Sequence, residues 1–191
     1  MTRAASPGQS ALLLLDVVDI LNALRVSYAI IGAFAASFYG VVRASLDADA
    51  LISLRPREAD ATPLIEALRT AGFTAVYTRG NARDPVGAVL TVEDPFGNRV
   101  DLLMGIQGMT EAVFTRTVES EFMNVKIRVV GIEDFIAMKI FAGSQKDLAD
   151  VTGALDVSRD LVDRPLLNEL VRAYGDDAVR TLRSLLKEPQ P

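Results

Sequence analysis

Two aspartates, Asp47 and Asp49, lie one residue apart near the start of an apolar stretch that runs from Leu46 to Leu54. Residues two apart in an extended strand point to the same side, so a strand here would place both carboxylates on one face. Like charges this close resist burial, and a divalent cation is the simplest compensation. Mg²⁺ favours carboxylates together with phosphate oxygens. A solvated strand face or strand end is the alternative explanation for the pair.

A third acid, Asp101, lies inside the apolar stretch from Arg99 to Leu103, which follows a dense turn signal at residues 94–98. A neighbouring strand would bring this carboxylate beside the first two. Three carboxylates of this kind suit a site with two metal ions, one activating the attacking oxygen and one bridging nucleotide phosphates. A position at the end of a strand near the turn is the alternative.

Gly32, Arg43 and Ser45 precede these acids and suit a phosphate ligand. Gly32 lies between a predicted strand and a predicted helix, where backbone N–H groups face an anion. Arg43 offers a charged fork and Ser45 a hydroxyl. An ordinary turn and exposed positions are the alternatives for these three residues.

Lys139 lies within an apolar stripe of its predicted helix. A helix advances about 100° per residue, so Lys139 falls in the middle of the stripe formed by Ile132, Phe135, Ile136 and Ile140. A cation there needs an acidic or phosphate partner, unless its stem runs along the apolar surface to water.

These residues resemble the signature of the nucleotidyltransferase superfamily, and more narrowly of the bacterial AbiEii-like and related minimal nucleotidyltransferases. That signature is a glycine turn and helix, an Arg, a Thr or Ser, and an alternating aspartate pair on a strand. Gly32, Arg43, Ser45, Asp47 and Asp49 match it, and Asp101 takes the place of the later strand carboxylate. A second block, comprising Lys139 and Lys146-Asp147-Leu148-Ala149-Asp150, resembles the helical element of the AbiEii-like group.

The resemblance implies transfer of a nucleoside monophosphate from a nucleoside triphosphate to an unidentified acceptor, which is RNA, a protein or a small molecule. It also implies a toxin–antitoxin or defence setting, and with it a cognate protein partner. The implied roles are Mg²⁺ or Mn²⁺ binding by Asp47, Asp49 and Asp101, phosphate binding by Gly32, Ala33, Arg43 and Ser45, charge neutralisation by Lys139, and lining of the site by Asp147 and Asp150. A solvated, ion-paired helix face explains Asp147 and Asp150 equally well.

Ala33 departs from the family pattern, which has Gly or Ser at this position, and so removes a hydroxyl contact to phosphate. This departure favours an alternative in which the chain is a weak or inactive member of the fold and acts as a binding or regulatory partner. A glycosyltransferase with an alternating aspartate pair is a third interpretation. It expects a longer nucleotide-binding region than the 46 residues that precede Asp47.

The predicted fold is α+β, a nucleotidyltransferase (polymerase beta-like) fold with a mixed sheet of about four or five strands flanked by helices. Residues 1–130 form the expected core, and residues 131–191 a C-terminal helical section packed on it. The predicted helices are 11–25, capped by Ser10, 33–39, 56–72 and 109–118, followed by the helical section. The predicted strands are 28–31, 46–54, 73–78, 86–93, 99–103 and 125–130.

Composition restricts the chemistry. The 191 residues include no cysteine and no histidine, which excludes disulfides, Ser-His-Asp triads and ordinary zinc sites. The formal net charge of −5 argues against a broad nucleic-acid-binding surface. Because the longest apolar run near the N-terminus is short and is followed by Asp16 and Asp19, we expect a cytoplasmic protein without a membrane span.

Overall fold

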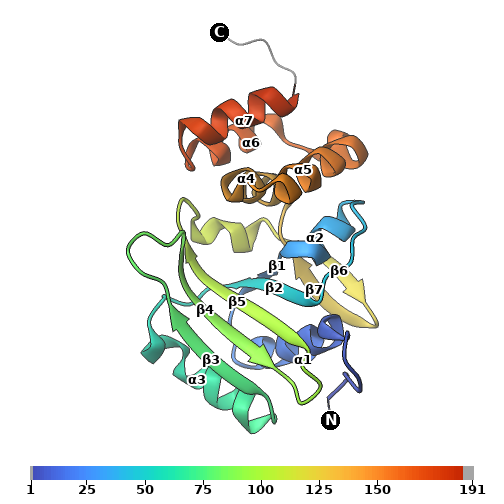
Figure 1. The fold of residues 1–191 in the computed structure, drawn as a ribbon, viewed down its shortest axis with the longest axis vertical. Helices are drawn as coiled ribbons and strands as arrows, with labels where there is room; N and C mark the ends of the chain where they lie inside the picture. Colours follow the sequence, from blue (N-terminus) through green and yellow to red (C-terminus); the bar gives the residue numbers. More distant parts are fainter. Residues whose placement is uncertain (1, 187–191) are drawn as a thin grey trace.

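One sheet of seven strands runs through residues 2–186, the part of the chain that the computed structural model describes (Figure 1). In spatial order the strands are β3 (Thr74–Arg79), β4 (Val86–Glu93), β5 (Arg99–Ile106), β2 (Asp47–Ile52), β1 (Tyr28–Ile30), β7 (Val125–Val129) and β6 (Val118–Phe122). The β2–β5 and β1–β7 pairs are parallel, and the other neighbours are antiparallel. The predicted mixed α+β fold is therefore confirmed, with more strands than expected.

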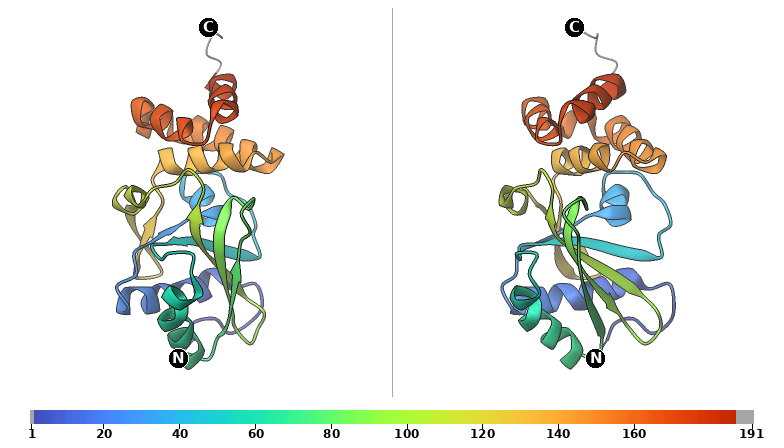
Figure 2. Two further views of the ribbon diagram at one scale, coloured as in Figure 1. Left: turned by 90° about the vertical axis from the view of Figure 1, so that its left-hand side faces the viewer. Right: turned by 60° about the vertical axis from the view of Figure 1, so that its left-hand side comes forward.

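Helices cover the sheet at two ends of the molecule. They are α1 (Ser10–Ala23), α2 (Gly32–Phe38), α3 (Glu58–Thr70), α4 (Ile132–Ala142), α5 (Gln145–Ser158), α6 (Arg164–Arg172) and α7 (Asp176–Leu186), with short 3₁₀ turns η1 (Glu111–Thr115) and η2 (Arg159–Leu161). Figure 2 shows α1 and α3 at one end, α4 to α7 stacked at the other, and the sheet between them. A single apolar cluster joins α1, the strands and the later helices.

The strand β6 is missing from the sequence-based prediction, which placed one helix over residues 109–118. The structure has the 3₁₀ turn η1 there, followed by a hairpin of β6 and β7. The turn of this hairpin is made by Met123 and Asn124, both with positive φ, as a tight two-residue hairpin turn requires. Glu119, Ser120 and Glu121 lie on β6, and these consecutive polar residues conceal the two-residue period of the strand.

Ser10 was predicted to cap α1, and that prediction is wrong. Gln9 occupies the N-cap position, and Ser10 begins the helix. The Ser10 hydroxyl instead donates a hydrogen bond to the carbonyl oxygen of Leu46 and accepts one of 3.0 Å from the N–H of Arg99. It therefore ties the first turn of α1 to the beginnings of β2 and β5, the two strands that carry the predicted acids.

The C-terminal helical section agrees with the sequence over residues 132–186, while residues 187–191 lie outside the described part of the chain. Pro165 falls in the first turn of α6 and Gly175 between α6 and α7, where the sequence predicts interruptions. The division into a core of 1–130 and a section from 131 stays a prediction. Among the described residues, no helix is both long and apolar enough to cross a membrane.

Gly32 forms the turn between β1 and α2, and the structure gives two reasons for a glycine there. Its φ is +63°, in the left-handed region that side chains disfavour. A Cβ atom added to Gly32 would lie 2.1 Å from Oδ2 of Asp49, closer than any real contact. Any residue with a side chain at position 32 would collide with the Asp49 carboxylate, so this turn requires glycine.

We predict that Gly32→Ala destabilises the protein more than Gly72→Ala does. Gly72 also has a positive φ, of +92°, but a Cβ atom added there would have no neighbour within 4 Å, so this variant measures backbone strain alone. That strain costs about 1–2 kcal/mol, and crowding of Asp49 adds about 1–3 kcal/mol for Gly32→Ala. Urea unfolding of both variants measures the difference. Equal losses of stability would contradict the close approach of Gly32 and Asp49.

Candidate functional site

Asp47, Asp49 and Asp101 lie on one face of the two parallel strands β2 and β5. Asp49 is paired directly with Asp101 in the register, and Asp47 is paired with Arg99. The alternate residues Ala48 and Val100 are buried in the core on the other face. Neighbouring strands are about 4.8 Å apart, so the backbone alone brings Asp49 and Asp101 side by side.

Asp49 carries the electrostatic cost of this arrangement. Burial raises the pKa of its carboxyl above the ordinary 3.8, and the negative charges of Asp101 and Asp47 raise it further. The positive charges of Lys139 and Arg43 act in the opposite direction without cancelling the shift. Four charged side chains therefore act on the single partly buried carboxylate of Asp49.

Asp101 already has partners of its own. The Thr91 hydroxyl donates a 2.7 Å hydrogen bond to its Oδ1, and Nη2 of Arg99 lies 2.9 Å from its Oδ2. Thr91 faces Asp101 from β4, and Arg99 lies two residues earlier on the same face of β5. Arg99 thus neutralises the acid that the sequence assigned to a second metal ion.

The three carboxylates fit a hard divalent cation in chemistry and in the face they share, since oxygen atoms are what Mg²⁺ prefers. Repulsion from Asp101 and Asp47 helps to raise the pKa of Asp49, and a bound cation would relieve that repulsion. Within residues 2–186, however, no group of three or more acidic side chains is gathered closely enough to hold a metal ion. The Asp101 carboxylate is engaged instead by Arg99 and by the Thr91 hydroxyl.

Lys139 is paired with acids, as its place in an apolar stripe requires. Its ammonium nitrogen lies 2.6 Å from Asp147 and 2.9 Å from Asp150. Asp150, only 2% exposed, also lies 3.2 Å from Nε of Arg43. One buried carboxylate on α5 therefore links the lysine of α4 to the arginine that precedes β2.

Asp147 also stabilises the first turn of α5. It forms a capping box with Ser144, in which the Ser144 hydroxyl accepts from the N–H of Asp147 while the Asp147 carboxylate accepts from the N–H of Ser144. Burial acts to raise the pKa of Asp147, but hydrogen bonds from Lys139 and Ser144 outweigh it and lower the pKa below 3.8. Asp147 is therefore held as a carboxylate.

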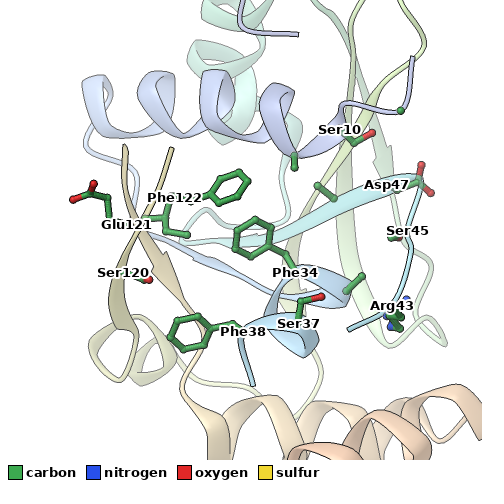
Figure 3. Close-up of a pocket in the computed structure, with 15 residues that line it drawn as sticks. Ser10, Phe34, Ser37, Phe38, Arg43, Ser45, Asp47, Ser120, Glu121 and Phe122 are labelled. Atoms are coloured by element: carbon green, nitrogen blue, oxygen red, sulfur yellow. The ribbon is translucent and has the colours of Figure 1, made fainter. Parts of the chain in front are cut away.

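A cavity of about 450 Å³, lined by polar and apolar side chains, lies on the Asp47 side of the cluster (Figure 3). We call it the serine-lined cavity, since Ser10, Ser37, Ser45 and Ser120 are in its wall. Figure 3 shows Arg43, Ser45 and Asp47 along one side, with Phe34 and Phe122 between them and Glu121. Ala33 also lines this cavity.

A second cavity, of about 340 Å³, lies on the Lys139 side. We call it the apolar cavity, because nine of its twelve lining residues are apolar. The other three are Gly32, Lys139 and Asp147. Gly32 borders this cavity and Ala33 borders the other, so the first turn of α2 lines both. Gly32 also abuts Asp49, which lines neither cavity.

The predicted site residues lie around Asp49 and the two cavities, with Ser45 and Asp47 exposed at the edge, and their roles stay predictions. Sequence reasoning missed Arg99, Thr91 and Ser144. The spacing of two between Arg99 and Asp101 was a usable signal, because it places both on one strand face. Thr91 carried no such signal, because its pairing depends on the hairpin register.

The chain matches no protein-family model and no curated protein. Solved structures do share its fold. An antigenic nucleotidyltransferase-like protein from Paracoccidioides brasiliensis is 14% identical with a TM-score of 0.54, over 98% of this chain and 97% of that one. The antibiotic-resistance factor ANT(2″)-Ia is 14% identical with a TM-score of 0.57, over 94% and 95%.

The lincosamide antibiotic adenylyltransferase LnuA, solved with lincomycin bound, is 12% identical with a TM-score of 0.53, over 81% of this chain and 100% of that one. At such identities the likeness establishes the fold. The narrower resemblance to the AbiEii-like group stays a prediction. The 191-residue chain has a nucleotidyltransferase-like fold.

Proposed function

We propose that this protein is a metal-dependent nucleotidyltransferase that moves a nucleoside monophosphate from a nucleoside triphosphate to a hydroxyl or phosphate acceptor. The observation that carries the proposal is the set of three carboxylates on one face of β2 and β5, beside Lys139 and Arg43. Adenylyltransferases that act on antibiotics are among the solved structures of similar fold, which supports nucleotidyl transfer.

In this proposal Asp47 and Asp49 hold Mg²⁺ or Mn²⁺, and Asp101 joins them when its ion pair with Arg99 opens. The metal supplies Lewis-acid polarisation of the phosphate and lowers the pKa of the acceptor hydroxyl, a task for which this chain has no histidine. Asp101 accepts the hydroxyl proton. Arg99, once released, remains a cation at the edge of the site.

The transfer step forms a bond between the acceptor oxygen and the α-phosphorus and breaks the bond from the α-phosphorus to the oxygen that bridges to the β-phosphate. Pyrophosphate leaves with the electron pair of that bond. Arg43 and Ser45 bind the phosphates, with the backbone of Gly32 and Ala33 beside them. Lys139 offsets the charge on the transferred group, held in place by Asp147 and Asp150.

The finer parts of the proposal rest on the sequence resemblance. They are a cytoplasmic setting, where nucleoside triphosphates are abundant, and a role with a cognate protein partner in a toxin–antitoxin or defence system. Identification of the acceptor tests them: incubation of the protein with α-³²P-labelled triphosphates and a cell extract shows whether RNA, a protein or a small molecule acquires label.

A second candidate function is that of a non-catalytic binding or regulatory protein. The observations that favour it are the Arg99–Asp101 ion pair, the lack of a three-acid cluster among residues 2–186, and Ala33 in place of Gly or Ser. Under this alternative the fold is kept, and the acids serve the ion-pair network alone.

We predict that Asp47→Asn lowers transfer by at least about two orders of magnitude, because it removes a metal-binding oxygen without removing volume. The rate of label transfer from α-³²P-labelled triphosphate measures the loss. Asp156→Asn, which makes the same change at an exposed position of α5, is the control. Full activity of Asp47→Asn would remove the metal-site assignment.

We predict that a nucleoside triphosphate binds only when Mg²⁺ is present. Titration calorimetry with ATP, CTP, GTP and UTP, each with and without Mg²⁺, measures this dependence. The expected result is metal-dependent binding of at least one triphosphate, which Asp47→Asn weakens and Asp156→Asn does not. If all four triphosphates fail to bind in the presence of the metal, the non-catalytic alternative is the correct one.

We predict that Asp49→Asn stabilises the metal-free protein at pH 7. Since the folded-state pKa of Asp49 is raised above 3.8, the folded protein binds this proton more tightly than the unfolded chain does. Stability is therefore lost as the pH rises from 3.8 through the folded-state pKa, and the amide escapes this loss.

Urea unfolding in EDTA at several pH values measures the effect. The advantage of Asp49→Asn over the unchanged protein is expected at pH 7 and should shrink on acidification through that window. Asp156→Asn is again the control and should show no such change. A variant less stable than the unchanged protein at every pH would overturn the assigned repulsion among the three acids.

A further inference from the structure

The nine apolar residues that line the apolar cavity have no role in the proposed chemistry of the phosphates, which involves only Gly32, Lys139 and Asp147 at its border. Its walls come from the ends of β4 and β5, through Val86, Leu103 and Ile106, and from α4, through Phe135, Met138 and Phe141. Its volume of about 340 Å³ is in the range of small-molecule pockets. A cavity of this size holds one small molecule and excludes a folded macromolecule.

The charged residues at its border are already satisfied. Lys139 lies 2.6 Å from Asp147 and 2.9 Å from Asp150, so its charge is paired with these acids, and in the proposed function it serves the transferred phosphate rather than a ligand of the apolar cavity. An ammonium or phosphate group placed against the remaining walls would lose its hydration without a partner. The chemistry of the cavity therefore selects an uncharged ligand with a large apolar part.

The cavity also begins next to the acids. Leu103 lies two residues after Asp101 on the same face of β5, and Gly32 touches the carboxylate of Asp49. Ala33, the next residue, lines the serine-lined cavity, which presents Arg43 and Ser45, residues that suit phosphates. Asp101 itself does not line the apolar cavity, so a ligand bound there has to extend past Leu103 to bring one end to this carboxylate.

We propose that the acceptor is an uncharged, mainly apolar small molecule with one hydroxyl group, bound in the apolar cavity with that hydroxyl toward Asp101. This inference rests on the proposed function and names its acceptor class. The hydroxyl oxygen forms the new bond to the α-phosphorus, its proton passes to Asp101, and pyrophosphate leaves. The product is a nucleoside monophosphate ester of an alcohol or phenol.

The binding test needs neither nucleotide nor metal. The fluorescence of 2-naphthol reports its binding, and a naphthol sulfonate provides a probe of the same ring system with a fixed negative charge. We expect 2-naphthol to bind and the sulfonate not to bind. Equal binding of the two probes, or no binding of 2-naphthol, would overturn the inference from the unchanged protein alone.

Variants locate the site. Leu103→Gln and Met138→Gln place an amide in the cavity wall and are expected to weaken 2-naphthol binding about tenfold. Leu54→Gln, at a partly buried leucine that does not line the cavity, should leave binding unchanged. If all three variants bind 2-naphthol as the unchanged protein does, the probe lies elsewhere and the inference fails. Circular dichroism confirms that each variant tested is folded.

Transfer from α-³²P-labelled triphosphates then separates the inference from the proposed function. The acceptors are a panel of apolar alcohols and phenols, the polycation tobramycin, and a short RNA. Labelling of an alcohol or phenol supports both. Labelling of only tobramycin or RNA overturns the apolar acceptor and leaves nucleotidyl transfer standing. If no triphosphate binds with Mg²⁺ while 2-naphthol still occupies the cavity, the proposed function falls and with it the acceptor role.

Discussion

Repulsion between Asp49 and Asp101 is the constraint on which the site depends. The parallel pairing of β2 with β5 places them opposite each other, and the apolar core on the reverse face keeps either strand from slipping by one residue. The fold therefore holds two negative charges side by side, and nearby cations offset their repulsion. Arg99 does so for Asp101, while Lys139 and Arg43 only reduce the cost at Asp49.

The cations that offset this charge come from distant parts of the chain. Arg43 precedes β2, and Lys139 lies on α4, yet Asp150 of α5 contacts both. This shared carboxylate joins the strands that carry the acids to the helices that follow residue 131. Arg43 and Asp47 line the serine-lined cavity, and Lys139 and Asp147 line the apolar cavity, so the same cluster borders both. The residues that balance the charge of the acids therefore also line the two cavities.

The sequence predicted much of this arrangement because its signals are local. The alternation at Asp47 and Asp49, the isolated acid at Asp101 and the lysine in an apolar stripe all follow from strand or helix period, and the fold class was confirmed. The strand β6 was missed because its central residues are polar. The pairing of Arg99 with Asp101 follows from strand period and was overlooked. The contact of Thr91 with Asp101 and the sharing of Asp150 depend on register and helix docking, which no spacing in the sequence encodes. The catalytic roles stay predictions.

The capping box of α5 connects helix stability to the charge of the site. Asp147 uses one carboxylate oxygen for Ser144 and the other for Lys139. A ligand that draws the ammonium of Lys139 toward itself leaves that carboxylate to the helix alone, and the first turn of α5 responds. The rate of hydrogen–deuterium exchange of the amides in this turn should therefore report whether a ligand has bound at Lys139, and the ligand itself needs no label.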